Sequence, residues 1–143
     1  MELKEDETGW YLALSEGSVQ LIQIDFRLGL LFREASSADG ARLDIGEPCY
    51  LKGPGGRVPL TPGETSTHAP ILPFFNAKVI GIAIQETGHL KVEFTGNRFL
   101  EIDPNDRYEA WELGCSIGFK LICSPGGSVA VFEFSDSSAR ATG

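Results

Sequence analysis

The chain of 143 residues has the size of one folded domain, with 42% hydrophobic and 22% charged residues, and this composition excludes a disordered or fibrous protein. A chain of this length can bury a core without a metal or a disulfide. Its 12 basic and 20 acidic residues give a net charge of −8, which disfavours nucleic-acid binding and favours a basic protein partner.

The N-terminal segment, residues 1–7, is acidic and lacks an apolar core, so we expect no secretory signal peptide. The longest apolar stretch, Leu28–Phe32, is far shorter than the roughly 20 residues of a membrane-spanning helix. We therefore predict a cytoplasmic protein that makes no contact with a membrane. The net charge is −6 over residues 1–50, +2 over 51–100 and −4 over 101–143, which places an acidic patch in the first and last thirds.

Alternating hydrophobicity predicts strands along most of the chain. Between Gln20 and Phe32, apolar side chains recur at a spacing of two, the period at which a strand presents one face. These side chains are Ile22, Ile24, Phe26, Leu28, Leu30 and Phe32. A shorter strand, which ends in an acid and a proline, follows over residues 41–48.

A similar pattern recurs over residues 78–104. Ile80, Ile82 and Ile84 share one face of a predicted strand, and two shorter alternating stretches follow before Pro104. The two regions therefore predict a tandem repeat of three-strand antiparallel meanders. Neither copy alone offers much core, so we expect the two to pack face to face or to join in one curved sheet.

Glycines and prolines mark the remaining boundaries. Residues 53–73 hold five prolines and four glycines, which predicts a long connection without a strand. One or two helical turns are expected at 104–108, and a C-terminal three-strand meander follows within 108–134. We therefore predict one mainly β domain over residues 1–134, packed as a sandwich or a curved partial barrel, and a disordered tail over residues 135–143.

The three cysteines, Cys49, Cys115 and Cys123, form no C-x-x-C pair. The simplest interpretation is that they are small buried hydrophobic side chains. A disulfide between Cys115 and Cys123 is the alternative, although a reducing cytosol disfavours it.

Two patterns could suggest catalysis or metal binding. Gly114–Gly118 matches G-x-S-x-G, but that nucleophile elbow needs a strand–turn–helix context and a later histidine. No histidine follows His89, so we interpret the segment as a hairpin turn. His68 and His89 lie 21 residues apart, with no further ligand at metal-binding spacing. We therefore expect both to face solvent and predict no metal, no cofactor and no catalytic residue.

Residues 103–109 hold three acids and one asparagine, which resembles a fragment of a calcium loop. The central glycine and the glutamate at the twelfth position of an EF-hand are absent. An Asp-Pro turn with side-chain capping explains the segment without a metal.

The segment Tyr108–Leu113 is the densest cluster of aromatic and acidic residues. In a strand, one face would hold Glu109, Trp111 and Leu113, and the other Tyr108, Ala110 and Glu112. An inward glutamate would need a basic partner and would become a binding group. Candidates for that partner are Arg98, Arg107 and Lys120. An outward Trp111 would instead be an exposed interface residue, and a core tryptophan with the glutamate at the sheet rim is the third interpretation.

Three stretches of the second half carry a family resemblance: Asp103–Leu113, Ile122–Gly127 and Val129–Phe132. They resemble an uncharacterised family of short bacterial proteins with a Tyr-Glu-Ala-Trp-Glu … Pro-Gly-Gly ending. The resemblance extends from about Gly17 to Phe132, where the family often has a tryptophan. It implies no activity, cofactor or partner, only candidate binding positions. These are Tyr108, Glu109, Trp111, Glu112, Pro125, Gly126 and Gly127. Pro-Gly-Gly is also a common hairpin turn, which alone would account for it.

The sequence favours a non-enzymatic module that binds another protein or a second copy of itself as a homodimer. An immunity-like role, in which a small acidic protein covers a basic enzyme, fits the charge by analogy. The alternative is a small-molecule site between the sheet units, near Glu109 and Trp111. A third hypothesis is an enzyme that uses Glu109, Asp103 or Asp106 as acid or base.

Overall fold

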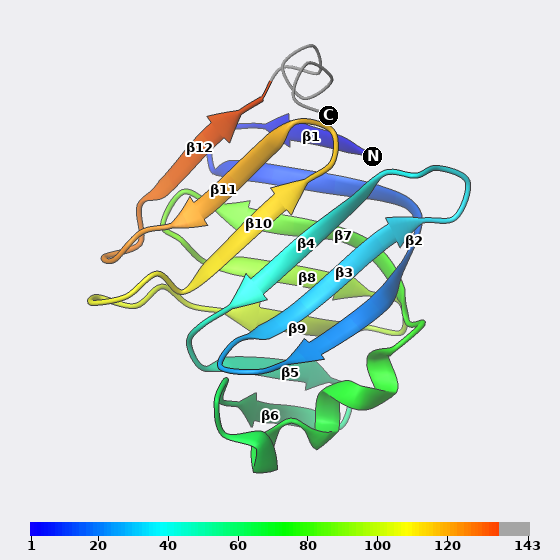
Figure 1. The fold of residues 1–143 in the computed structure, drawn as a ribbon, viewed down its shortest axis with the longest axis vertical. Coiled ribbons are helices and arrows are strands. Elements are labelled where there is room, and N and C mark those ends of the chain that lie inside the picture. The colour runs from blue at the N-terminus through cyan, green and yellow to red at the C-terminus, as the bar shows by residue number, and fades with distance from the viewer. Residues whose placement is uncertain (135–143) are drawn as a thin grey trace.

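The computed structural model describes residues 1–134, and the tail predicted over 135–143 lies outside the described residues. Within residues 1–134, twelve strands form one antiparallel sheet, and two short 3₁₀ helices precede β7 (Figure 1). The elements are β1 (Glu2–Glu5), β2 (Gly9–Ile24), β3 (Leu28–Glu34), β4 (Gly40–Ile45), β5 (Cys49–Gly53), β6 (Gly56–Leu60), η1 (Thr65–Thr67), η2 (Ala69–Phe74), β7 (Lys78–Gln85), β8 (Leu90–Phe94), β9 (Arg98–Ile102), β10 (Trp111–Cys115), β11 (Phe119–Cys123) and β12 (Val129–Glu133).

The three predicted meanders are confirmed. They are β2–β3–β4, β7–β8–β9 and β10–β11–β12, and the third extends the first because β10 pairs with β4. The strand order is β12-β11-β10-β4-β3-β2-β7-β8-β9-β5-β6, and β1 pairs with the first half of β2. Within the described residues, the sheet does not close into a barrel, since β12 and β6 lie at its opposite ends.

Strand β2 folds the sheet over on itself. Its first half pairs with β7 and its second half with β3, and the register with β7 shifts between Ala13 and Gly17. Glu16, inside this irregularity, has a φ of 49°, as expected where a bulge bends a strand. As a result the front layer, β3, β4 and β10–β12, crosses over the back layer, β5–β9 (Figure 1).

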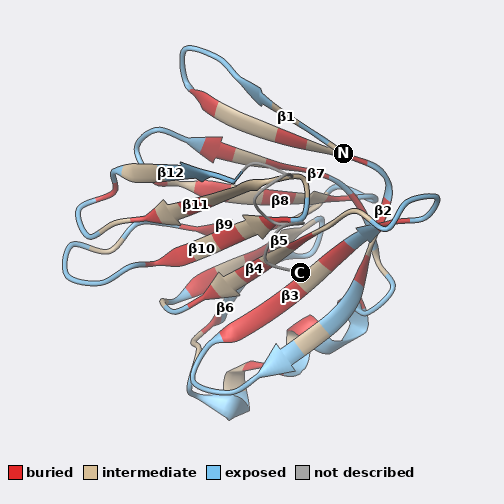
Figure 2. Cartoon of the chain, turned by 45° about the horizontal axis from the view of Figure 1, so that its top comes forward, coloured by how far each residue is buried: buried red, intermediate tan, exposed pale blue. Residues whose placement is uncertain are grey.

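The core lies between the two layers (Figure 2). Its largest fully buried side chains are Trp111 from β10, Phe32 from β3 and Phe94 from β8. The inward faces of both layers contribute to this core, so neither layer has a core of its own. This agrees with the prediction that the two three-strand repeats pack against each other. In residues 1–134, no helix has both the length and the apolar composition that crossing a bilayer requires.

The predicted face from Ile22 to Phe32 is interrupted by a turn. Residues between β2 and β3 form a hairpin, and Phe26 at its tip is 90% exposed. The alternate side chains Leu28, Leu30 and Phe32 are fully buried, and in the first half of the run only Ile22 packs partly against the core. The turn contains three residues, so the apolar residues of β2 and β3 keep a spacing of two in the sequence across it. The sequence pattern therefore looks like one continuous strand. The strand also begins earlier than the pattern indicated, at Gly9.

Three further predictions need correction. Ile80 is exposed although Ile82 and Ile84 are buried, because the register between β7 and β8 shifts between Val79 and Gly81 and reverses the faces. The connection predicted over 53–73 contains β6, whose Pro59 is tolerated at the edge of the sheet. The helical turns lie in η1 and η2, and residues 104–108 contain no helix.

Candidate functional site

Trp111, the first residue of β10, lies in the core between the two layers. Its side chain is 1% exposed, and its indole Nε1 donates a 2.9 Å hydrogen bond to the carbonyl of Gly88, in the turn between β7 and β8. A buried indole N–H needs such an acceptor. Of the three interpretations of this segment, the structure shows the core tryptophan, so Trp111 is not an exposed interface residue.

Glu109 lies outside the strand predicted for it. Strand β10 begins only at Trp111, and the adjacent Ala110 is also buried, its carbonyl accepting a 3.0 Å hydrogen bond from Gly46 N. Two consecutive buried residues break the alternation of faces, and Glu109 is exposed. The inward placement, in which a basic side chain would neutralise a buried Glu109, is therefore wrong.

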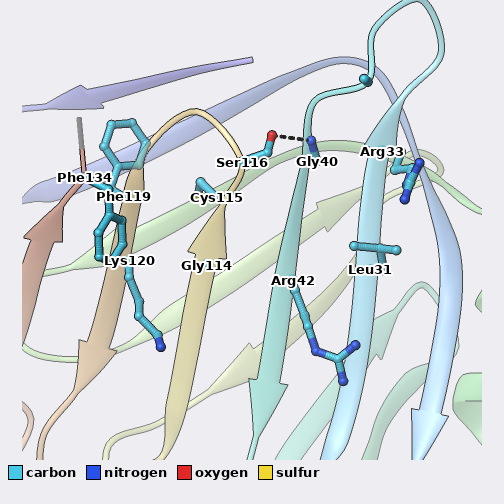
Figure 3. Close-up of a pocket in the computed structure, with 11 residues that line it drawn as sticks. Leu31, Arg33, Gly40, Arg42, Gly114, Cys115, Ser116, Phe119, Lys120 and Phe134 are labelled. Atoms are coloured by element: carbon cyan, nitrogen blue, oxygen red, sulfur yellow. Dashed lines mark hydrogen bonds between the residues drawn. The ribbon is translucent and has the colours of Figure 1, made fainter. Parts of the chain in front are cut away.

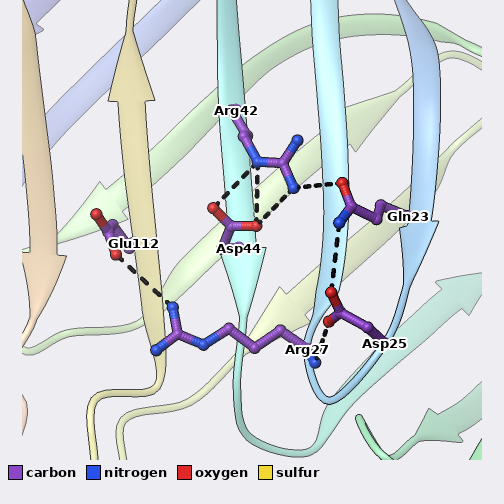
Figure 4. A network of polar contacts seen from close by, with 6 residues as sticks. All are labelled: Gln23, Asp25, Arg27, Arg42, Asp44 and Glu112. Carbon is purple, nitrogen blue, oxygen red and sulfur yellow. Dashed lines mark hydrogen bonds and ion pairs between the residues drawn. The ribbon is translucent and has the colours of Figure 1, made fainter.

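Glu112 points outward from β10 and contacts two basic side chains. Lys120 of β11 forms one ion pair with it, and Arg27 Nη1 lies 3.8 Å from its Oε2. These contacts belong to a polar network across the outer face of the front layer (Figure 4). The figure shows Gln23, Asp25, Arg27, Arg42, Asp44 and Glu112. Asp44 and Glu112 each pair with a base, whereas Asp25 accepts hydrogen bonds from the Gln23 amide and from Arg27 N. Glu112 therefore does not offer an unpaired charge to a partner.

Two exposed aromatic side chains flank a hollow beside Glu109. Phe26 is 90% exposed at the tip of the β2–β3 hairpin, and Tyr108 is 62% exposed before β10. The open hollow between them has a volume of about 380 Å³. It is lined by Phe26, Arg27, Gly46, Glu47, Tyr108 and Glu109. We call Phe26, Glu47, Tyr108 and Glu109 the aromatic–acid surface.

The sequence placed Tyr108 and Glu109 in the candidate site but missed Phe26. Its position could have been found from Asp25, because an aspartate side chain often accepts a hydrogen bond from the backbone two residues later and so forms a turn. In the structure, Arg27 N donates a 2.8 Å hydrogen bond to Asp25 Oδ1. This turn holds Phe26 away from both strands.

The cavity that touches both Glu109 and Trp111 has a volume of only about 10 Å³. A volume of that size holds at most one water molecule. The small-molecule site predicted between the sheet units near these two residues therefore has no room for a ligand in this structure.

Pro125, Gly126 and Gly127 form the turn between β11 and β12. Both glycines have a positive φ, 89° and 103°, as a tight turn of this kind requires. Gly126 N donates a 2.8 Å hydrogen bond to the carbonyl of Asn105, and Gly127 packs against the Thr87–Gly88 backbone. The Pro-Gly-Gly turn and Trp111 thus meet at the β7–β8 turn, where the two layers are joined. We call this contact of Trp111, Gly88 and Gly127 the layer junction.

Ser116 lies in the turn between β10 and β11, which confirms the hairpin predicted for the G-x-S-x-G pattern. Its Oγ accepts a 2.9 Å hydrogen bond from Gly40 N (Figure 3). The turn borders a hollow of about 410 Å³ on the outer face of the front layer. Its lining includes three bases, Arg33, Arg42 and Lys120, and no histidine. Ser116 Oγ also donates a 3.3 Å hydrogen bond to Asp39 Oδ1, so its hydroxyl ties the β10–β11 turn to the β3–β4 turn and acts as a structural turn residue.

The prediction that both histidines face solvent is wrong for His68. Its side chain is buried, and Nε2 donates a 3.1 Å hydrogen bond to the carbonyl of Thr61. His89 is partly exposed, and its Nδ1 lies 2.8 Å from Asp103 Oδ1. Among residues 1–134, no group of three His, Cys, Asp or Glu side chains is arranged to hold a metal ion.

Capping in the 103–109 loop comes from Asn105. Its side-chain Oδ1 accepts hydrogen bonds from Arg107 N at 2.8 Å and from Tyr108 N at 3.1 Å. This Asx turn explains the loop without a metal, as predicted, although the capping residue is the asparagine and not an aspartate. The turn also fixes the exposed position of Tyr108.

All three cysteines are free and buried, so the alternative disulfide between Cys115 and Cys123 is wrong. Burial raises the pKa of Cys49 and of Cys115 to about 12, and it raises the pKa of Cys123 as well. A thiol in such surroundings is inert because the thiolate is the reactive form.

We expect the folded protein to resist thiol reagents. At about pH 8, the three thiols should react with a disulfide reagent about 100-fold more slowly than in the denatured chain. Absorbance of the released thiolate measures both rates, and the chain in guanidinium serves as the control in which all three react. Fast reaction of one thiol in the folded protein would contradict the buried placement.

The comparison with protein families agrees with the resemblance stated above. The model of a "Family of unknown function (DUF6188)" matches residues 10–133, which is most of the chain. No curated protein and no solved structure matches it. The expectation of an uncharacterised family is confirmed: the chain belongs to DUF6188, a family of unknown function.

Proposed function

We propose that the protein is a non-enzymatic protein-binding module whose aromatic–acid surface contacts a basic partner. The observation that carries the proposal is Phe26, 90% exposed at a hairpin tip beside Tyr108. A phenyl ring in this position contributes nothing to the core. Its burial against a partner would stabilise a complex by about 2 kcal/mol, and aromatic side chains are enriched among the residues that dominate binding energy.

The charges around the hollow support a basic partner. Glu47 and Glu109 line it, and Arg27, the one base among its lining residues, already lies 3.8 Å from Glu112. The net charge of −8 would steer a basic protein towards this acidic molecule. A basic enzyme that is covered by the protein, as in an immunity pair, is the partner class that the charge supports by analogy.

Capture experiments with purified protein variants test the aromatic–acid surface. The double variant Phe26→Ser, Tyr108→Ala should recover at least about tenfold less of the basic partner than the wild type, since it loses both anchors. The matched control is Leu72→Ser, Phe75→Ala, which removes two residues that are exposed elsewhere on the chain. All three proteins should unfold within about 2 °C of one another, because none of these side chains packs in the core.

The captured protein, once purified, should bind the wild type and the control with equal affinity and the Phe26→Ser, Tyr108→Ala variant at least about tenfold more weakly in calorimetry. Raising the salt concentration should weaken binding further if Glu47 and Glu109 contribute. Equal recovery of every protein by all three baits would rule out this surface.

A further inference from the structure

In the described part of the chain, strand β12 is an edge strand with one unpaired side. It ends the strand order and, within the described residues, pairs only with β11. From this edge we infer that β12 pairs antiparallel with β12 of a second copy, so that the protein forms a two-fold symmetric dimer with one sheet running through both copies. This surface shares no residue with the aromatic–acid surface.

The hydrogen bonds between β12 and β11 show which residues of β12 direct their backbone N–H and C=O groups to the free edge. Phe134 N donates to Gly118 O at 2.6 Å, and Ser124 N donates to Ser128 O at 2.8 Å, so residues 128 and 134 face β11. Along an antiparallel strand, successive residues direct their N–H and C=O groups to opposite sides. Val129, Val131 and Glu133 therefore direct theirs to the free edge.

This pattern is complementary to itself. If Val131 of one copy lies opposite Val131 of the other, Val129 lies opposite Glu133, and all three residues form hydrogen-bonded pairs with about six new hydrogen bonds. On the outer face, Ala130 then lies opposite Phe132, and the small side chain leaves room for the phenyl ring. Glu133, the single charged residue of the strand, lies opposite Val129 of the second copy and not opposite the second Glu133.

The other edges of the sheet are protected against such pairing, whereas β12 is not. Strand β6 contains Arg57 and Pro59, and three of the four residues of β1 are charged. Charges and prolines are the usual means by which edge strands avoid pairing with another chain. Strand β12, Val-Ala-Val-Phe-Glu, has apolar residues on both faces and no proline.

Val131 also shows that the core is incompletely covered at this edge. Its register partner on β11, Leu121, is fully buried, so Val131 belongs to the inward face. It is nevertheless 40% exposed. A groove of about 360 Å³ runs beside it, between β12 and the β1–β2 end of the back layer. Leu3, Glu5, Trp10, Phe119, Val131 and Glu133 line the groove. A second β12 would bring a valine against Val131 at this uncovered end.

Sedimentation equilibrium tests the dimer. The wild type should sediment with twice the chain mass at about 1 mM, and Val131→Lys should raise the dissociation constant at least about tenfold, because two like charges would meet on the two-fold axis. Val58→Lys is the matched control, since Val58 lies on the edge strand β6 and is 41% exposed. It should leave the dissociation constant unchanged, and circular dichroism should show that both variants keep the fold.

Cross-linking tests the register. Paired Cα atoms in a hydrogen-bonded antiparallel pair lie about 5.5 Å apart, which a disulfide can span. Val131→Cys should therefore form a disulfide-linked dimer under mild oxidation, while the native thiols stay buried. Val129→Cys should not, because the two Val129 Cα atoms would lie roughly 14 Å apart.

Three results would overturn the proposal. They are a wild type that stays monomeric at about 1 mM, a dimer that persists in Val131→Lys, and equal cross-linking of Val129→Cys and Val131→Cys. A monomeric wild type overturns it even if a chain ending at Phe134 dimerises, because the proposal concerns the full chain.

Discussion

Replacing Trp111 by alanine should lower the free energy of unfolding by about 4 kcal/mol, as measured by guanidinium denaturation. The side chain is 1% exposed and is the largest in the core. Its removal would leave a cavity between the front and back layers. It would also remove the 2.9 Å hydrogen bond that Trp111 Nε1 donates to Gly88 O. A loss of this size is a large share of the roughly 5–15 kcal/mol by which folded domains are stable, so we expect the variant to unfold at a much lower guanidinium concentration than the wild type.

Two further substitutions separate packing from hydrogen bonding at Trp111. Trp111→Phe keeps an aromatic ring but has no N–H, so it should cost about 2 kcal/mol through a smaller ring and the loss of the hydrogen bond to Gly88 O. Tyr108→Ala is the control within the same segment, and it should cost less than about 0.5 kcal/mol because its ring is exposed. A cost below about 1 kcal/mol for Trp111→Ala would contradict a role in joining the layers.

Replacing Gly88 by alanine should lower the free energy of unfolding by about 3 kcal/mol. Gly88 has a φ of +97°, which L residues adopt at a cost, and its new Cβ would lie 2.5 Å from Gly127 O and 3.0 Å from Cys123 Sγ. The oxygen belongs to the backbone of the opposite turn and cannot move aside without disturbing β11 and β12. Equilibrium denaturation in urea measures the effect.

Gly126→Ala is the matched control for backbone strain. Gly126 has a similar φ of +89°, but a Cβ there would meet nothing within 4 Å. The control should therefore cost only about 1 kcal/mol, and the difference between the two variants measures the close approach of Gly88 to Gly127. Equal costs would mean that the layer junction is looser than the structure shows.

These expectations separate five of the positions that the family resemblance implies into two groups. Trp111, Gly126 and Gly127 hold the layers and their turns together, so their substitution is expected to act on stability. Tyr108 and Glu109 lie on the surface beside Phe26, and their substitution is expected to act on binding. Studies of binding should therefore avoid Trp111, because its variants would lose a partner simply by unfolding.

Short hairpins are the part of this fold that can be predicted from sequence. The strands near residues 90–94 and 98–102 follow strict alternation, and glycines with positive φ at 88 and 96 supply their turns. Local propensity and burial agree there, because each strand pairs with its neighbour in the chain. The same holds for β10 and β11, where Gly118 closes the turn at a φ of 111°.

Irregularities of the sheet could not be predicted in this way. The alternation through Ile22–Phe32 does not locate the turn that exposes Phe26, and the alternation through Ile80–Ile84 does not reveal the register shift that exposes Ile80. Bulges depend on the partner strand, which local sequence does not name. The burial of His68 could not be predicted either, because its ring bonds to the carbonyl of Thr61, which lies in an irregular segment.

By itself, the sequence determined the mainly β class, the three meanders and the hairpin at Ser116, because these depend on alternation and turn residues close together in the chain. Only the tertiary structure decided that Trp111 is buried, that Phe26 joins Tyr108 at one hollow, and that, among residues 1–134, β12 is left at an open edge. Each of these depends on how β2 bends and brings distant strands together. A pattern of period two specifies which residues share a face, but not which other strand that face will meet.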